Sequence, residues 1–270
     1  AIRLRGDGSG AGLGSDADAL LIGQIGRLQP ELVWRDATAS TASWSVGAGW
    51  LVRGAAPERE LFLHSPDLER QVALYSAARD PDRMAPAGGL PRVIGRDVLF
   101  EVGGSGGHAL MAYDVERGLH PLVPGGRAQA DGNAGTDGRH LVWTRGEGGA
   151  GPDGVFPRRS IVAADYTTDP GAIRPRRLRS DPNPTIGAHD MRFAVGCGFA
   201  GRNAMPPRDL LLVRIADGAS WQLAAVPGWS WGQVLGFTCQ EAFVTVFSRS
   251  QGISIARVRL DSLGPGRPPD

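Results

Sequence analysis

The feature that most constrains this chain is an internal repeat. A polar or glycine-containing turn followed by a short apolar run recurs along the sequence, as in "TDGRHLVWTRG" (136–146). A near-constant period of this kind indicates that one supersecondary unit is stacked several times. Aligned copies are spaced by roughly 43 to 51 residues at Ile2, Trp50, Val98, Leu141, Met191 and Ala242.

A second motif follows each copy of the first. It consists of an apolar run, a turn rich in Asp, Pro or Gly, and usually a second run that ends in Leu, as in 109–122 and 210–223. Each repeat therefore contains four short strands joined by turns. We predict an all-β fold, a β-propeller of about six four-stranded antiparallel blades.

The fourth repeat illustrates the predicted strand order. The innermost strand precedes the turn at Asp137-Gly138, and "LVW" (141–143) is the second strand. The third strand is "SIVAAD" (160–165), and the outermost contains "RRL" (176–178). In long windows of the sequence the apolar residues do not recur with the helical period of 3.6 residues, so we expect few helices longer than two turns.

The two ends of the repeat array are irregular. The first repeat starts at the second-strand position, and "GPGRPPD" (264–270) cannot supply a fourth strand to the last repeat because its prolines lack a backbone N–H. We predict one propeller domain over 1–263, followed by a Pro/Gly-rich C-terminal tail over 264–270.

The repeat resembles that of the TolB-like propeller family. The similarity lies in "DGRHLVW" (137–143), "ALMAYDVERG" (109–118) and "LLLVRIADG" (210–218), although the Ser-Pro that precedes Asp-Gly in the family is absent. The resemblance extends over nearly the whole chain as weak repeats. It implies a six-bladed propeller and says little about the role of the protein.

The charge balance argues against a polyanion partner. The net charge is +1, and all 29 basic residues are arginine, which we interpret as codon bias of a GC-rich bacterial genome. Dense arginine groups occur only at 157–159 and 174–179, so we expect no nucleic-acid binding.

No apolar run is long enough for a membrane helix, so we expect no transmembrane segment. The chain opens on "AIRLRG", and we expect a mature or trimmed form from which any targeting segment has been removed. We predict an extracytoplasmic location, periplasmic or secreted.

Metal-binding and catalytic motifs are weak. The five histidines lack metal-ligand spacing. The segment "DGNAGTDG" (131–138) has oxygen ligands but not the spacing of an EF-hand, so it is either a calcium loop or a turn-rich connector. We expect no metal and no cofactor, and no catalytic residue is identified.

Tryptophans give the strongest site signal. "PGWSWGQ" (227–233) places Trp229 and Trp231 just before or within an innermost strand, and Trp44 occupies the matching point of an earlier repeat. We group Arg92 with them as a candidate ligand-binding residue. Two interpretations remain open: packing between blades, or an aromatic platform for a sugar or peptide.

Unequal loops indicate which face binds. The connections at 145–159 and 196–209 are long, and strand alternation puts them on the same face as the segments that lead to Trp44 and Trp229. We predict a non-enzymatic interaction module that binds a protein, a small ligand or a glycan on this face. The alternatives are a propeller hydrolase or lyase acting on carbohydrate or peptide, and a lectin that uses the tryptophans.

The two cysteines, Cys197 and Cys239, leave two alternatives open. An extracytoplasmic protein with two cysteines usually pairs them. With 187–197 taken as a turn and second strand, however, Cys197 and Cys239 lie on opposite faces, about 16 Å apart for five residues of strand. A disulfide requires Cα atoms within about 7 Å.

Overall fold

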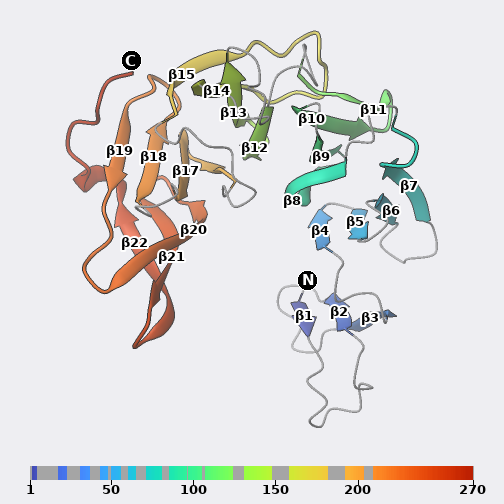
Figure 1. Ribbon diagram of the computed structural model, residues 1–270, viewed down its shortest axis with the longest axis horizontal. Helices are drawn as coiled ribbons and strands as arrows, with labels where there is room; N and C mark the ends of the chain where they lie inside the picture. Colours follow the sequence, from blue (N-terminus) through green and yellow to red (C-terminus); the bar gives the residue numbers. More distant parts are fainter. Residues whose placement is uncertain are drawn as a thin grey trace. The chain divides into compact units, whose positions relative to one another are not determined.

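The computed structural model describes fourteen stretches of the chain. These are residues 2–4, 18–22, 31–36, 43–47, 50–55, 60–64, 71–80, 85–95, 97–104, 107–123, 131–147, 158–181, 192–203 and 209–269. Contacts divide the chain into two compact units, and the second contains 87–89, 100–112 and 120–270. Among the described residues the secondary structure is almost entirely strand, with a single 3₁₀ turn, η3 (Leu260–Ser262) (Figure 1).

The strands form six sheets within the described ranges. The strand pairs of sheets one, two, four, five and six are antiparallel. Sheet one has three strands, β1 (Ile2–Leu4), β2 (Asp18–Ile22) and β3 (Glu31–Asp36). Sheet two has four, β4 (Ser43–Gly47), β5 (Trp50–Ala55), β6 (Glu60–His64) and β7 (Gln71–Ser76). Sheet three contains β8 (Ala85–Ile94), β9 (Asp97–Gly104), β10 (Gly107–Asp114) and β11 (Gly118–Pro121).

The remaining sheets belong to the second unit. Sheet four comprises β12 (Asp131–Thr136), β13 (His140–Glu147), β14 (Arg158–Asp165) and β15 (Arg176–Ser180). Sheet five comprises β16 (Ala194–Gly196), β17 (Phe199–Asn203), β18 (Leu210–Arg214) and β19 (Ser220–Leu223). Sheet six has three strands, β20 (Trp229–Phe237), β21 (Glu241–Ser248) and β22 (Gly252–Arg259).

The predicted strand order of the fourth repeat is confirmed. Strands β12 to β15 pair in chain order, and each pair is antiparallel. The turn that starts at Asp137 closes the first hairpin, because the Asp137 carboxylate accepts the backbone N–H groups of Arg139 and His140. This is the ordinary role of aspartate in a turn.

The segment 131–136 is neither a calcium loop nor a connector, because it forms the strand β12. Asp131 is fully buried, and its carboxylate accepts bonds from Trp143 Nε1 at 3.0 Å and Arg145 Nε at 2.8 Å. Its oxygens are therefore occupied by neighbouring side chains of β13.

The predicted register of the fifth repeat is wrong. The innermost strand is β16, which pairs with β17 through the two-residue turn Cys197-Gly198. Both turn residues have positive φ, 48° and 78°, as a type I′ hairpin requires. Cys-Gly thus replaces Asp-Gly here, and alignment on the polar residues "GAHD" (187–190) placed the repeat one strand too early.

The corrected register shortens one predicted loop. The strand β17 occupies Phe199–Asn203, inside the segment 196–209 that we expected to be a long loop. The connection from β17 to β18 is limited to the residues between Asn203 and Leu210. The other predicted long loop lies between Glu147 and Arg158, and its residues 148–157 are outside the described part.

The core of the second unit lies between neighbouring sheets. One cluster joins sheets four and five and includes Val142, Ile161, Phe193 and Leu211. A second joins sheets five and six and includes Leu212, Trp221, Val244 and other apolar side chains. Sheets four, five and six therefore pack face to face in chain order, with apolar side chains in the interfaces.

A disulfide joins Cys197 and Cys239, with Cα atoms 5.0 Å apart. Cys239 lies in the turn between β20 and β21, as predicted. Because Cys197 lies in the equivalent turn of sheet five, both cysteines are at the same end of adjacent sheets. The geometric argument against the bond depended on the wrong register.

Candidate functional site

A turn and a strand position the two candidate tryptophans of sheet six. The N–H of Trp229 donates to the Val226 carbonyl at 2.9 Å, and Gly228 between them has a φ of 84°. Proline followed by a glycine with positive φ is the pattern of a type II turn, which directs the chain into β20. Trp229 and Trp231 are thus on an innermost strand, as predicted, and both are half-buried.

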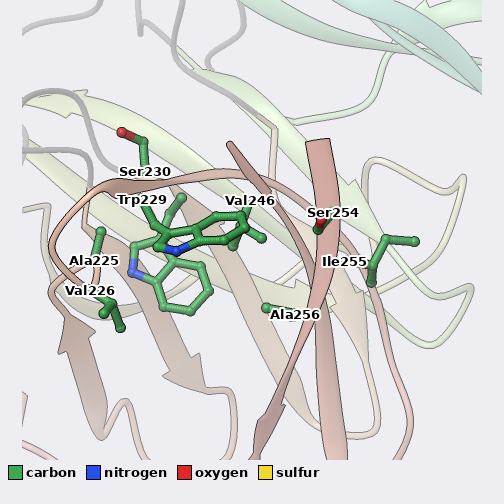
Figure 2. Close-up of a pocket in the computed structure, with 9 residues that line it drawn as sticks. Ala225, Val226, Trp229, Ser230, Val246, Ser254, Ile255 and Ala256 are labelled. Atoms are coloured by element: carbon green, nitrogen blue, oxygen red, sulfur yellow. The ribbon is translucent and has the colours of Figure 1, made fainter. Parts of the chain in front are cut away.

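A cavity of about 330 Å³ adjoins these tryptophans. Figure 2 shows Ala225 and Val226 on the incoming loop and Ser254, Ile255 and Ala256 on the strand β22. The remaining lining side chains are Trp229, Ser230, Trp231 and Val246. The cavity therefore crosses the three strands of sheet six and is mainly apolar.

One polar group in this lining has no partner. The indole Nε1 of Trp231 is buried and makes no hydrogen bond within the described part of the chain. Tryptophan N–H groups usually find an acceptor when buried, and an unsatisfied donor costs about 1–3 kcal/mol. The cavity thus combines an apolar wall with one donor that an acceptor atom of a ligand could satisfy.

Trp44 and Arg92 also lie on innermost strands, in β4 and β8. Both belong to the first compact unit, which includes residues 1–86 and 90–99. Their membership in one site with Trp229 and Trp231 remains a prediction.

Arginines of the segment 174–179 donate hydrogen bonds to other groups of the chain. Arg176 donates to the Ile215 carbonyl at 2.5 Å, Arg174 to the Gly171 carbonyl at 2.5 Å, and Arg177 to Ser160 and Ser180. A second cavity of about 480 Å³ lies beside this segment, with His140 and Asp165 in its lining. These bonds give the arginines a structural role.

A buried ionic group was not identified from the sequence. The fully buried Arg202 pairs with Asp181, and Arg159 lies 3.9 Å from the same carboxylate. Arg202 also lies over the ring of Phe193, 5.1 Å from its centroid. These residues come from β17, β14 and the end of β15, so the sequence carries no local signal that they meet.

No group of three or more acidic, cysteine or histidine side chains suited to a metal ion occurs among the described residues. No helix in that part is long and apolar enough to cross a membrane.

Comparison with known proteins supports the fold. No model of a known protein family matches the sequence, and no curated protein matches it. Among solved structures, a prolyl endopeptidase has a TM-score of 0.58 and 10% identity over 92% of this chain and 37% of its own. A chain of a nidogen/laminin complex has a TM-score of 0.52 and 9% identity over 89% of each chain.

A protein described as TolB from Agrobacterium tumefaciens has a TM-score of 0.48 and 10% identity over 86% of this chain and 85% of its own. A score below 0.5 does not place this chain in the TolB-like family, so that membership remains a prediction. The chain spans little more than a third of the prolyl endopeptidase it matches.

The sheets, together with the prolyl endopeptidase and the chain of the nidogen/laminin complex, define the class of this protein. It is an all-β propeller built mainly from four-stranded antiparallel blades. At these identities the similarity concerns the fold alone and does not distinguish a binding module from a peptidase.

Proposed function

We propose that this chain is a non-enzymatic β-propeller interaction module that binds a protein partner at the cavity beside Trp229 and Trp231. The observation that carries the proposal is an apolar cavity of about 330 Å³ with a single unsatisfied donor, Trp231 Nε1. Cavities of this size with few polar groups are typical of ligand sites. Tryptophan is also among the residues that contribute most to protein interfaces.

The strand topology also supports a binding site at the end of the sheets where the cavity lies. β20 begins at the end of sheet six where β21 turns into β22. Strand alternation puts the connection between β13 and β14 at the equivalent end of sheet four. The long connection and the cavity therefore belong to the same type of sheet end, which in repeat proteins is often the binding side. A chain of the nidogen/laminin complex shows that a similar propeller occurs in a protein–protein assembly.

The compartment we propose is extracytoplasmic, periplasmic or secreted. The disulfide between Cys197 and Cys239 supports this, because such bonds persist mainly in oxidising environments.

The test is a capture experiment with the whole chain as bait, followed by measurement of binding of each captured protein to purified variants. We expect Trp231→Ala to weaken binding at least tenfold, and shortening of 148–157 to weaken it further. Leu235→Ala is the matched control, because Leu235 is on the same strand, is 51% exposed and does not line the cavity. Equal binding by wild type and Trp231→Ala would contradict the proposal.

The second candidate is a peptidase-type or other hydrolase propeller, because one of the solved structures with a similar fold is a prolyl endopeptidase. Turnover of peptide or glycoside substrates by the isolated chain would support it. A glycan array would detect the lectin alternative.

A further inference from the structure

The outer edge of sheet six differs from that of the complete sheets of the second unit. In sheets four and five the third strand pairs with a fourth strand, β14 with β15 and β18 with β19. In sheet six, β22 is the last strand among the described residues. The following tail does not return to it, because Arg267 forms a bridge with Ser220 of β19. Within the described part of the chain, β22 therefore presents an edge of backbone donors and acceptors.

The register identifies where a fourth strand would pair. His140, the first residue of β13, pairs with Asp165, the last residue of β14. In the same way Glu241, the first residue of β21, pairs with Arg259, the last residue of β22. Counting from these pairs, the β14 positions that pair with β15, residues 160–163, correspond to residues 254–257 of β22. Three of these four residues, 254–256, are also the β22 wall of the cavity. The unpaired edge and the cavity thus form one continuous surface.

The side chains of this surface define what would fit. Residues on β22 that pair with Val246 and Val244, namely Ser254 and Ala256, share the cavity side of the sheet with Trp231. A strand paired with β22 would place a side chain opposite Ser254 at the mouth of the cavity. The apolar lining favours a large apolar side chain there, and Trp231 Nε1 favours an accompanying carbonyl oxygen.

The positive charge of β22 is a second feature that would select a peptide. β22 contains Arg257 and Arg259 and no acidic residue. The side chain of Arg257 is 68% exposed, and its contact to Glu241 is long, at 3.9 Å. An acidic residue directly across from Arg257 would form a favourable cross-strand pair.

We infer that β22 binds an extended peptide of a partner protein as the fourth, antiparallel strand of sheet six. The peptide carries an acidic residue opposite Arg257 and, three residues further along, a large apolar residue opposite Ser254 that enters the cavity. This inference deepens the proposed function and depends on it for the location of the site. Strand addition of this kind takes affinity from main-chain bonds and specificity from alternate side chains.

The experiment uses the full chain and a fluorescein-labelled synthetic peptide of sequence TVETVWVT, in which the glutamate and tryptophan have this spacing. We expect saturable binding by fluorescence anisotropy. Hydrogen exchange of β22 amides that do not bond β21 should slow when the peptide is added. A peptide with proline in place of the valine between its central threonine and its tryptophan should lose binding. This valine lies opposite Ile255, so its N–H faces β22, and proline lacks that donor.

Two protein variants test the register. Arg257→Glu should weaken binding of TVETVWVT by about two- to fivefold, and a peptide with lysine in place of glutamate should regain it. Ser254→Leu should weaken binding by filling the cavity, whereas Leu235→Ala, the control, should bind as wild type.

Unchanged exchange of β22 amides at saturating peptide would overturn the inference. So would a concentration-dependent dimer in which the β22 edge is already protected, because a second copy would then be the occupant. If Trp231→Ala abolishes binding of a captured partner while β22 amides remain unaffected, the strand inference fails and the proposed function stands.

Discussion

At the scale of single residues, a buried carboxylate links the first two strands of sheet four. Asp131 is fully buried and bonds both Trp143 and Arg145. Burial raises its pKa, although the bonds from Arg145 and Trp143 oppose that shift. The carboxylate therefore joins the start of β12 to two side chains of β13.

Replacing Asp131 by Ala should destabilise the fold. The buried indole N–H of Trp143 and the guanidinium of Arg145 lose their acceptor, which costs about 3 kcal/mol for a broken buried pair. Urea unfolding of the purified variant measures this. Asp131→Asn keeps an acceptor for Trp143 and should lose less; equal losses would show that the charge alone matters.

A surface carboxylate gives a prediction for pH. The pKa of Asp217 falls from 3.8 to about 2, mainly because the Arg214 guanidinium donates to it, with a further bond from the backbone N–H of Ala219. Since the folded pKa is depressed, the stabilising contribution is present above the unfolded pKa and is lost as pH falls through about 2.

NMR titration of the Asp217 carboxyl carbon should give a midpoint near 2 in wild type. In Arg214→Gln the midpoint should move towards 3.8, the ordinary value. An unchanged midpoint would mean that the backbone bond alone holds the carboxylate ionised.

At the scale of elements, the turns of sheets five and six are linked covalently. The disulfide closes a loop with a sequence separation of 42 residues. In the chain-entropy model such a loop contributes about 4 kcal/mol to the free energy of unfolding.

Reduction should therefore lower the urea midpoint markedly. Thiol titration of the denatured, unreduced protein should find no free thiol, because both cysteines are bonded. The double variant Cys197→Ser with Cys239→Ser should be destabilised to the same degree and should no longer respond to reductant. Two free thiols in the unreduced protein would be incompatible with the bond.

The C-terminal segment also acts as an element, because it covers sheet five. Trp221 donates from Nε1 to the Gly264 carbonyl at 3.2 Å, and Arg267 and Ser220 exchange two backbone bonds. A Cβ on Gly266 would lie 2.8 Å from the indole of Trp221, so the tail packs closely on this ring.

Terminating the chain after Leu263 should expose Trp221, which is 9% exposed in the intact protein. We expect a red shift of tryptophan emission and a loss of about 1–2 kcal/mol from the missing hydrogen bonds. The same truncation in Trp221→Phe should show no comparable shift. A truncated protein with unchanged emission would indicate that the tail does not cover the ring.

At the scale of the whole molecule, the predicted fold is an all-strand propeller, and four of the six described sheets have the full complement of four strands. Far-ultraviolet circular dichroism should show strand and turn signals without a helical spectrum. A spectrum dominated by helix would contradict the fold.

The sequence alone determined the class of fold, because strand alternation and turn chemistry are local. The Asp137-Gly138 turn and the runs at 141–143, 160–165 and 176–178 were sufficient to predict the strand order of sheet four. The same reasoning placed Trp229 and Trp231 on an innermost strand. It also predicted an incomplete repeat at each end of the array, and among the described residues sheets one and six have three strands each.

The tertiary structure decided what depends on contacts between distant residues. Cys197 and Gly198 both have positive φ and form the turn that Asp-Gly forms in the fourth repeat. This position in the turn brings Cys197 beside Cys239. The pairing of Arg202 with Asp181, and the cavity that joins Trp231 to Ser254, arise where different strands meet. No local pattern specifies such contacts, because they depend on how strands align across a sheet and how sheets pack against each other.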